Sequence, residues 1–256
     1  MSAVMDRVNA MSVWMDVLPD TPSAGSGFDV DTQYVTFSTY NVAKTRLGDG
    51  LLRLAASARI SDDPPQAKYG THLLALRPAL VSAAKGWWLT SSSDSASRAW
   101  NACCLLADDR KMGAEAMRRS ILHGGPRTFD DIAIAFERVQ HRYERDAGDI
   151  RQGKPKVPGD TKLIQDMAAD IDAYYGSVDA KSDAFLLWNA SSSLAHGERW
   201  YADLHHSSEH LAQTLTERSF DIVCSGLNLL SQRILHLAAT PPTSVDLSGT
   251  PVGSPN

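Results

Sequence analysis

The chain has 256 residues, 43% of them hydrophobic and 21% charged, which is typical of a folded globular protein and not of a disordered one. Its formal charge of −5 argues against broad, nonspecific binding of nucleic acid, which needs an electropositive face, but leaves room for a local basic patch. Cys103, Cys104 and Cys224 form no C-x-x-C pair, which argues against a disulfide framework or a thiolate zinc site and indicates small buried hydrophobic residues in a reducing cytoplasm.

The N-terminal part of the chain divides into a short helix, a linker and a longer helix. Residues 1–18 predict the short helix, and charged residues interrupt its apolar positions, so it does not read as a signal peptide. Residues 19–30 are rich in Pro, Gly and Ser and predict a linker. A helix is expected over 31–60, although two glycines weaken it by about 1 kcal/mol each and residues 34–39 have some strand character.

Three helices are expected in the middle of the chain. The first covers about 69–90, and Pro78 predicts a kink within it. The second covers about 94–123 and ends at a Gly-Gly-Pro stretch. The third opens after that stretch, where Thr128 and Asp131 have the form of a capping box.

The C-terminal part predicts three more helices. One runs from about Leu163 to Gly176, and two follow over about 182–204 and 207–238. Residues 240–256 have the composition of a disordered tail. The fold class expected is therefore all-α: one bundle of about seven or eight helices over residues 31–239. No segment has the roughly 18 uninterrupted apolar residues of a membrane span, so we expect a cytoplasmic protein without membrane contact.

A zinc-protease motif, H-x-x-E-H, occurs at His206, Glu209 and His210. In such proteases both histidines lie on one helix face and converge on zinc. Ser207 or Ser208 is a natural N-cap, which would place His206 outside the helix that carries His210. The motif is therefore interpreted as surface histidines at a helix start, and no metal and no cofactor are expected.

The segment 186–204 is the least ordinary helix. Asn189, Ser192, His196, Arg199 and Asp203 follow one another at steps of 3, 4, 3 and 4, which places them on one side of a helix. An imidazole is suited to acid–base chemistry near neutral pH, and a guanidinium can hold an anion such as phosphate. The alternative is a packing face: small residues in the same segment would let a neighbouring helix approach closely, with the polar side chains satisfied inside.

Two stretches, LRPALVSAAKGWWLT at 76–90 and LWNASSSLAHGERW at 187–200, resemble helices of uncharacterised bacterial all-helical proteins. More distantly, the chain is similar to HEPN-type domains of defence and toxin systems. Active members of that family cleave RNA without a metal, using an Arg and a His four to six residues apart on paired protomers. Arg118 with His123, and Arg199 with His205, have that spacing here.

Two main functions are consistent with these observations. The first is a non-catalytic helical module that forms a homo-oligomer or binds a protein partner, since tryptophans and small residues suit tight contacts. The alternative is a HEPN-like ribonuclease with RNA as its partner. Its catalytic residues would be His196, Arg199 and His205, with Arg118 and His123 as the other possible pair, and its ligand-binding residues would be Asn189, Ser192 and Asp203. A third idea is a pocket for a small anion or nucleotide at His196 and Arg199.

Overall fold

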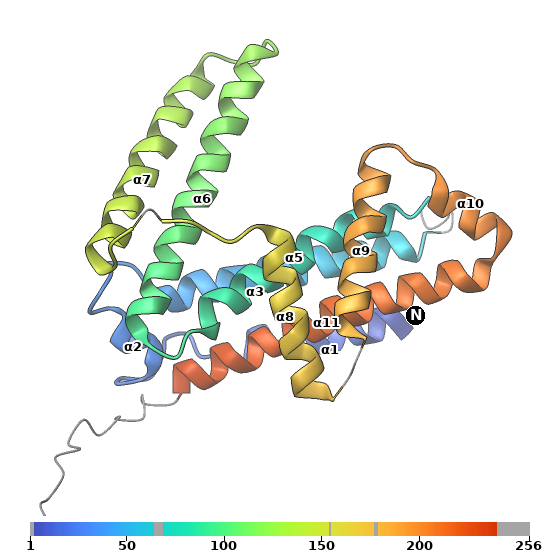
Figure 1. Cartoon of the computed structure of the whole chain (residues 1–256), viewed down its shortest axis with the longest axis horizontal. Coiled ribbons are helices and arrows are strands. Elements are labelled where there is room, and N and C mark those ends of the chain that lie inside the picture. Colours follow the sequence, from blue (N-terminus) through green and yellow to red (C-terminus); the bar gives the residue numbers. More distant parts are fainter. Residues whose placement is uncertain (1–2, 64–68, 154, 177–178, 240–256) are drawn as a thin grey trace, which may run out of the picture.

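The computed structural model describes residues 3–63, 69–153, 155–176 and 179–239, and every regular element in them is a helix (Figure 1). The all-α prediction is thus confirmed, with ten helices in these residues where seven or eight were expected. The helices are α1 (Ala3–Val17), α2 (Gly27–Asp31), α3 (Thr39–Ser61), α5 (Thr71–Ser91), α6 (Ser95–Leu122), α7 (Thr128–Ile150), α8 (Asp160–Tyr175), α9 (Ala180–Ala195), α10 (Trp200–Ser207) and α11 (Glu209–Ala239). The predicted tail, 240–256, lies outside the described residues.

Two predicted boundaries near the N-terminus were wrong. The helix expected over 31–60 begins only at Thr39, because Ser38 caps α3 by accepting from the Asn41 N–H at 3.1 Å. The predicted linker, 19–30, contains most of a separate short helix, α2, which Ser26 caps. Residues 32–38 form the loop between α2 and α3, without strand structure.

The capping box predicted at Thr128 was also wrong. Thr128 is the first helical residue of α7, and no side chain caps that helix. The first free N–H groups are satisfied instead by a backbone turn, in which Phe129 donates to the Pro126 carbonyl at 3.0 Å and Asp130 donates to the Arg127 carbonyl at 2.9 Å.

Helix α11 is the centre of the bundle. It packs against every other described helix except α6 and α7, and its buried face includes Leu215, Phe220, Leu227, Leu230 and Ile234. By length and composition α11 is the one helix among the described residues that could cross a membrane, but half of that apolar segment is buried inside the protein. Such burial is the pattern of a core helix.

Close approach to α11 explains two glycines inside other helices. A Cβ on Gly50 of α3 would lie 2.5 Å from Leu227 Cδ2, and a Cβ on Gly86 of α5 would lie 2.5 Å from Leu230 Cδ2. The conformational cost of glycine in a helix, about 1 kcal/mol, is offset here because the leucines occupy the space that a side chain would fill.

A buried ion pair joins α2 to α6. Arg98 and Asp31 have side chains only 2% and 0% exposed, and they form two contacts, from Nη2 to Oδ1 at 2.8 Å and from Nε to Oδ2 at 3.2 Å. The carboxylate also accepts from Thr39 Oγ1 at 2.8 Å. The remaining guanidinium hydrogens go to the carbonyls of Gly27, Ser92 and Ser93 and to Ser95 Oγ. Every charge in this buried group therefore has partners.

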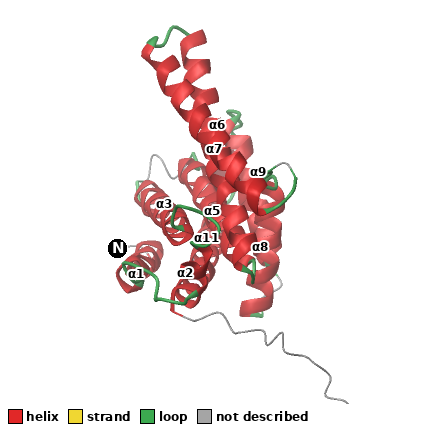
Figure 2. Ribbon diagram, turned by 90° about the vertical axis from the view of Figure 1, so that its left-hand side faces the viewer, coloured by secondary structure: helices red, strands yellow, loops and turns green. Residues whose placement is uncertain are grey.

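Helices α6 and α7 form an antiparallel hairpin that projects from the bundle (Figures 1 and 2). Among the described helices α7 packs against α6 alone, whereas the first part of α6 also touches α2, α3 and α5. The outer part of this hairpin therefore has its own small contact surface and no support from the core.

Candidate functional site

The polar row predicted on one helix does not exist as a row. Helix α9 ends at Ala195, and Gly197 adopts a left-handed conformation with φ 81°. The Gly197 N–H donates to the Leu194 carbonyl at 3.0 Å and the Glu198 N–H donates to the Ser193 carbonyl at 3.2 Å, which is the Schellman motif that terminates helices. The prediction of one helix over 182–204 was therefore wrong, because the glycine ends it before the row is complete.

The five residues of that row are consequently separated. Asn189 and Ser192 lie on α9, exposed and half-buried respectively, while His196 and Arg199 lie exposed in the loop before α10. Asp203 is exposed on α10. Within the described chain, only backbone hydrogen bonds join members of this set, from the His196 N–H to the Ser192 carbonyl at 3.2 Å and from the Asp203 N–H to the Arg199 carbonyl at 3.1 Å. Among the described residues the five side chains are not drawn together into one polar face.

His205 lines a small pocket of about 200 Å³ between α3, α5, α10 and α11. The other residues of this pocket are Ser61, His72, Tyr201, Glu209, Gln213 and Thr216. His205 is half-buried there, whereas its partner in the predicted Arg–His pair, Arg199, is exposed and does not line the pocket. The pocket does not bring that pair together.

His72 is the buried group of this small pocket. Its Nε2 lies 3.0 Å from Thr216 Oγ1, and the same hydroxyl lies 2.8 Å from the Tyr201 hydroxyl. Its Nδ1 has no partner and is buried. Burial lowers the pKa of His72 to about 4, so the imidazole is neutral at pH 7. The ring packs edge-on against Tyr201 and parallel to Phe220, with centroids 5.6 Å and 6.3 Å apart, so packing accounts for the position of His72.

The second predicted pair, Arg118 and His123, lies on the projecting hairpin. Arg118 Nε and Nη2 each lie 2.9 Å from an oxygen of Glu137, and its Nη1 lies 3.3 Å from Asp130. His123 caps the C-terminal end of α6 and is exposed. The guanidinium thus directs three of its five N–H donors to two carboxylates of α7.

The H-x-x-E-H motif is divided between two helices. His206 lies on α10, and Glu209 and His210 lie on α11. The Leu211 N–H lies 3.4 Å from Ser208 Oγ, so the expected serine cap is Ser208. In the part of the chain that the structure describes, no three His, Cys, Asp or Glu side chains gather as a metal site would require.

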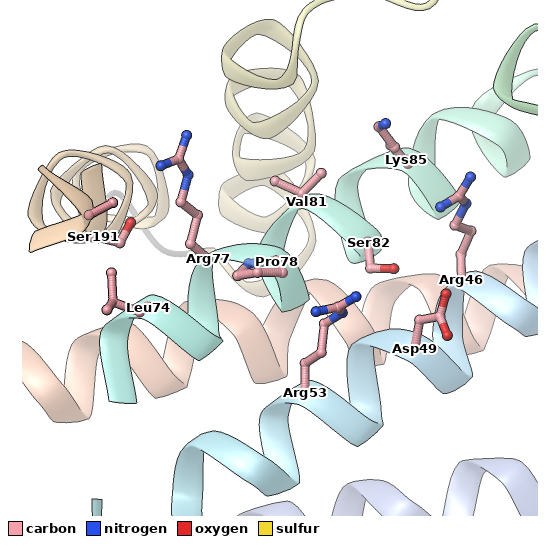
Figure 3. A pocket seen from close by; sticks show the side chains of 11 residues that line it. Arg46, Asp49, Arg53, Leu74, Arg77, Pro78, Val81, Ser82, Lys85 and Ser191 are labelled. Atoms are coloured by element: carbon pink, nitrogen blue, oxygen red, sulfur yellow. The ribbon is translucent and has the colours of Figure 1, made fainter. Parts of the chain in front are cut away.

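A pocket that the sequence did not reveal lies between α3, α5 and α9 (Figure 3). Its volume is about 430 Å³, within the range of small-molecule sites. Its charged lining residues are four cations, Arg46, Arg53, Arg77 and Lys85, and one carboxylate, Asp49. Its other lining residues are Leu74, Pro78, Val81, Ser82, Ser191 and Ala195. We call this site the basic pocket.

Two of the four cations are held from outside the pocket. Arg46 is paired with Asp109, and Lys85 Nζ lies 3.4 Å from Asp108, both carboxylates belonging to α6. The side chains of Arg46 and Lys85 are each only 14% exposed. Partial burial and pairing fix the positions of these two side chains, which still line the pocket.

The other two cations have no carboxylate partner within ion-pair distance in the described chain. Arg53 projects into the pocket from α3. Arg77 projects from α5, with its guanidinium carbon 4.0 Å from the centre of the Trp188 ring of α9. A guanidinium cannot lose its proton near neutral pH, so both positive charges persist. The arrangement can bind an anion.

Sequence reasoning missed this site because its residues are far apart in the chain. A signal does exist within each helix: Arg46, Asp49 and Arg53 are spaced by 3 and 4 residues, and Arg77, Val81 and Lys85 by 4 and 4. Each set alone is what an ordinary solvated helix face contains. Only the crossing of α3 and α5 turns the two faces toward one cavity.

Self-association and RNA cleavage remain predictions from the sequence, as does the resemblance to HEPN-type domains. Comparisons with models of known protein families, with curated proteins and with solved structures find no match to this chain.

Proposed function

We propose that this protein is a non-catalytic helical binding module whose basic pocket holds a small, multiply charged anion such as a phosphorylated compound. The observation that carries the proposal is the meeting of four cationic side chains with one carboxylate in a single cavity. The chain as a whole is acidic, with a formal charge of −5, whereas the lining of the pocket has more positive than negative side chains.

The position of the cations also favours binding. Arg46 and Lys85 are anchored by carboxylates of α6, and Arg77 lies against Trp188. Side chains that are already held lose little conformational freedom when a ligand arrives, so more of the interaction energy appears as affinity. Guanidinium groups match the geometry of phosphate and carboxylate oxygens, and three of the four cations are arginines.

The chemistry of the lining favours binding over catalysis. The described pocket is lined by two serines and one exposed aspartate, without a histidine or cysteine to serve as general base or nucleophile near neutral pH. The hydroxyl of Ser191 donates to the Leu187 carbonyl at 2.7 Å, which holds that serine in the helix. Positioning of an anion is the function that these groups can perform.

Calorimetry and thermal unfolding with inorganic tripolyphosphate test this proposal. A ligand present at about 100 times its Kd stabilises the folded protein by about 2.7 kcal/mol, which raises Tm by about 5 °C or more. Arg53→Gln should weaken tripolyphosphate binding at least tenfold. Arg59→Gln is the matched control, because Arg59 is an exposed arginine of the same helix outside the pocket. Absence of binding to the wild type, or equal weakening by both variants, would contradict the proposal.

A further inference from the structure

The basic pocket has two chemically different ends (Figure 3). Arg46, Asp49 and Lys85 lie at one end, and Arg53 lies between the ends. Leu74 and Ser191 lie at the other end, near Arg77. A ligand that fills the pocket therefore has an anionic part at one end and a part suited to apolar or planar contact at the other.

The second end is built around a stacked guanidinium. A guanidinium is planar and has two faces, and the Arg77 group lies over the Trp188 ring at 4.0 Å. Because Arg77 also lines the pocket, it presents this flat group to the cavity. Planar heterocycles such as nucleobases stack on arginine in this way.

We infer that the ligand of the basic pocket is a nucleoside phosphate, with its base against Arg77 and Leu74 and its phosphates toward Arg53, Arg46 and Lys85. This inference rests on the proposed function, since it names the class of anion that the pocket takes. The volume of about 430 Å³ fits a small molecule of this kind. Four cations gathered around one pocket of limited size favour a single nucleotide over a nucleic acid strand, which is contacted along an extended charged groove.

The experiment compares ATP with inorganic tripolyphosphate, which has the phosphates but no base, on the full chain by calorimetry. For the wild type we expect ATP to bind at least tenfold more tightly. Arg77→Lys keeps the charge but removes the flat surface, so it should weaken ATP binding by a larger factor than tripolyphosphate binding and abolish most of that preference. Arg53→Gln should weaken both ligands. Leu74→Gln, at a position that is 38% exposed, is a second variant at the base end and should reduce only the ATP affinity.

The outcomes separate the two proposals. If neither ligand binds, the anion-binding function itself is wrong. If tripolyphosphate binds as tightly as ATP, or if Arg77→Lys and Leu74→Gln weaken both ligands equally, the pocket binds anions and the nucleoside inference is wrong. Tighter binding of a single-stranded oligonucleotide than of ATP would also overturn the inference, in favour of a nucleic acid ligand.

Discussion

Arginine side chains occupy two opposite environments in this protein. Arg98 is enclosed by the core, and its hydrogen-bond donors meet a carboxylate, three backbone carbonyls and a serine hydroxyl. Arg53 and Arg77 stand at a cavity, and within the described chain neither has a carboxylate within ion-pair distance. The first arrangement binds parts of the protein to each other, and the second leaves charge available for something else.

The difference follows from the cost of removing a charge from water. A guanidinium can be fully buried only if the structure replaces nearly all of its lost hydrogen bonds. At a cavity open to solvent that requirement does not apply, so positive charge can accumulate without complete compensation. A guanidinium group without a full set of protein partners, at a position where folding does not need its charge, is therefore a better indication of a ligand site than a fully paired one.

The strongest test of the comparison is removal of the buried charge. Arg98→Met leaves the Asp31 carboxylate enclosed without its partner, and we expect the free energy of unfolding to fall by about 3–5 kcal/mol. Chemical denaturation measures this change. Binding of tripolyphosphate by the protein that stays folded should be unaltered, because Arg98 is not part of the basic pocket.

A double variant shows which contacts matter. Asp31→Leu combined with Arg98→Met removes both charges but leaves the carbonyls of Gly27, Ser92 and Ser93 without their donor. Stability should therefore recover only in part. Full recovery would show that these carbonyl contacts contribute nothing.

His72 extends the comparison to a buried group that is kept neutral. Its pKa of about 4 in the folded protein is below the ordinary value of 6.5, so as pH falls the unfolded chain takes up a proton first. Stability from His72 is therefore fully present above pH 6.5 and is lost as pH falls toward 4, by up to about 3 kcal/mol.

The contribution of His72 is isolated by comparing pH profiles of the unfolding free energy. His72→Gln removes the titrating ring, so its profile should be flatter than that of the wild type between pH 6.5 and pH 4. His123→Gln, at an exposed position on the hairpin, should keep the wild-type profile. Parallel profiles for the wild type and His72→Gln would show that His72 does not control this acid sensitivity.

A change in salt concentration should affect the pocket arginines and the buried Arg98 differently. Charges at an open pocket are screened by ions, whereas a dry pair is screened much less. Raising the salt from about 0.05 M to about 0.5 M should weaken tripolyphosphate binding about tenfold, or about 1.4 kcal/mol. The stability difference between the wild type and Arg98→Met should change little, and a collapse of that difference would mean that water reaches the ion pair.

The smallest expected effect is on the stability of the pocket variants. Without ligand, Arg53→Gln should change the free energy of unfolding by no more than about 0.5 kcal/mol, since Arg53 is exposed and forms no ion pair in the described chain. Denaturation in ligand-free buffer measures it. A loss above about 2 kcal/mol would make Arg53 a structural residue and weaken the comparison.

Much of the fold could be predicted because hydrophobic periodicity is local. The rhythm of apolar residues predicted α5, α6, α8 and α11 to within a few residues, and Gly176 ends α8 in the left-handed conformation as its position indicates. The predicted helix boundaries were wrong where a local backbone feature, a glycine turn or a serine cap, overrode the periodicity of the apolar residues. At Gly197 a left-handed turn divided an expected helix, and at Ser38 a cap began one later than expected.

The candidate site could not be predicted in the same way. Its cations belong to helices that meet only in three dimensions, and no spacing in the sequence records that α3 and α5 are neighbours. For the predicted polar residues the reverse holds. His196 and Arg199 have the spacing of one helix face in the sequence, but they lie where α9 ends and before α10 begins. The sequence pattern grouped residue types that can do chemistry, but it did not reveal which helices bring such residues together.

The projecting hairpin has a practical consequence. Its tip at Gly124 and Gly125 is distant from α11, and α7 touches no described helix other than α6. Exposed loop tips accept inserted sequence with little effect on the remaining domain. A fluorescent reporter or an affinity peptide placed between those two glycines would therefore give a tagged protein in which both ends of the chain and the basic pocket are left untouched.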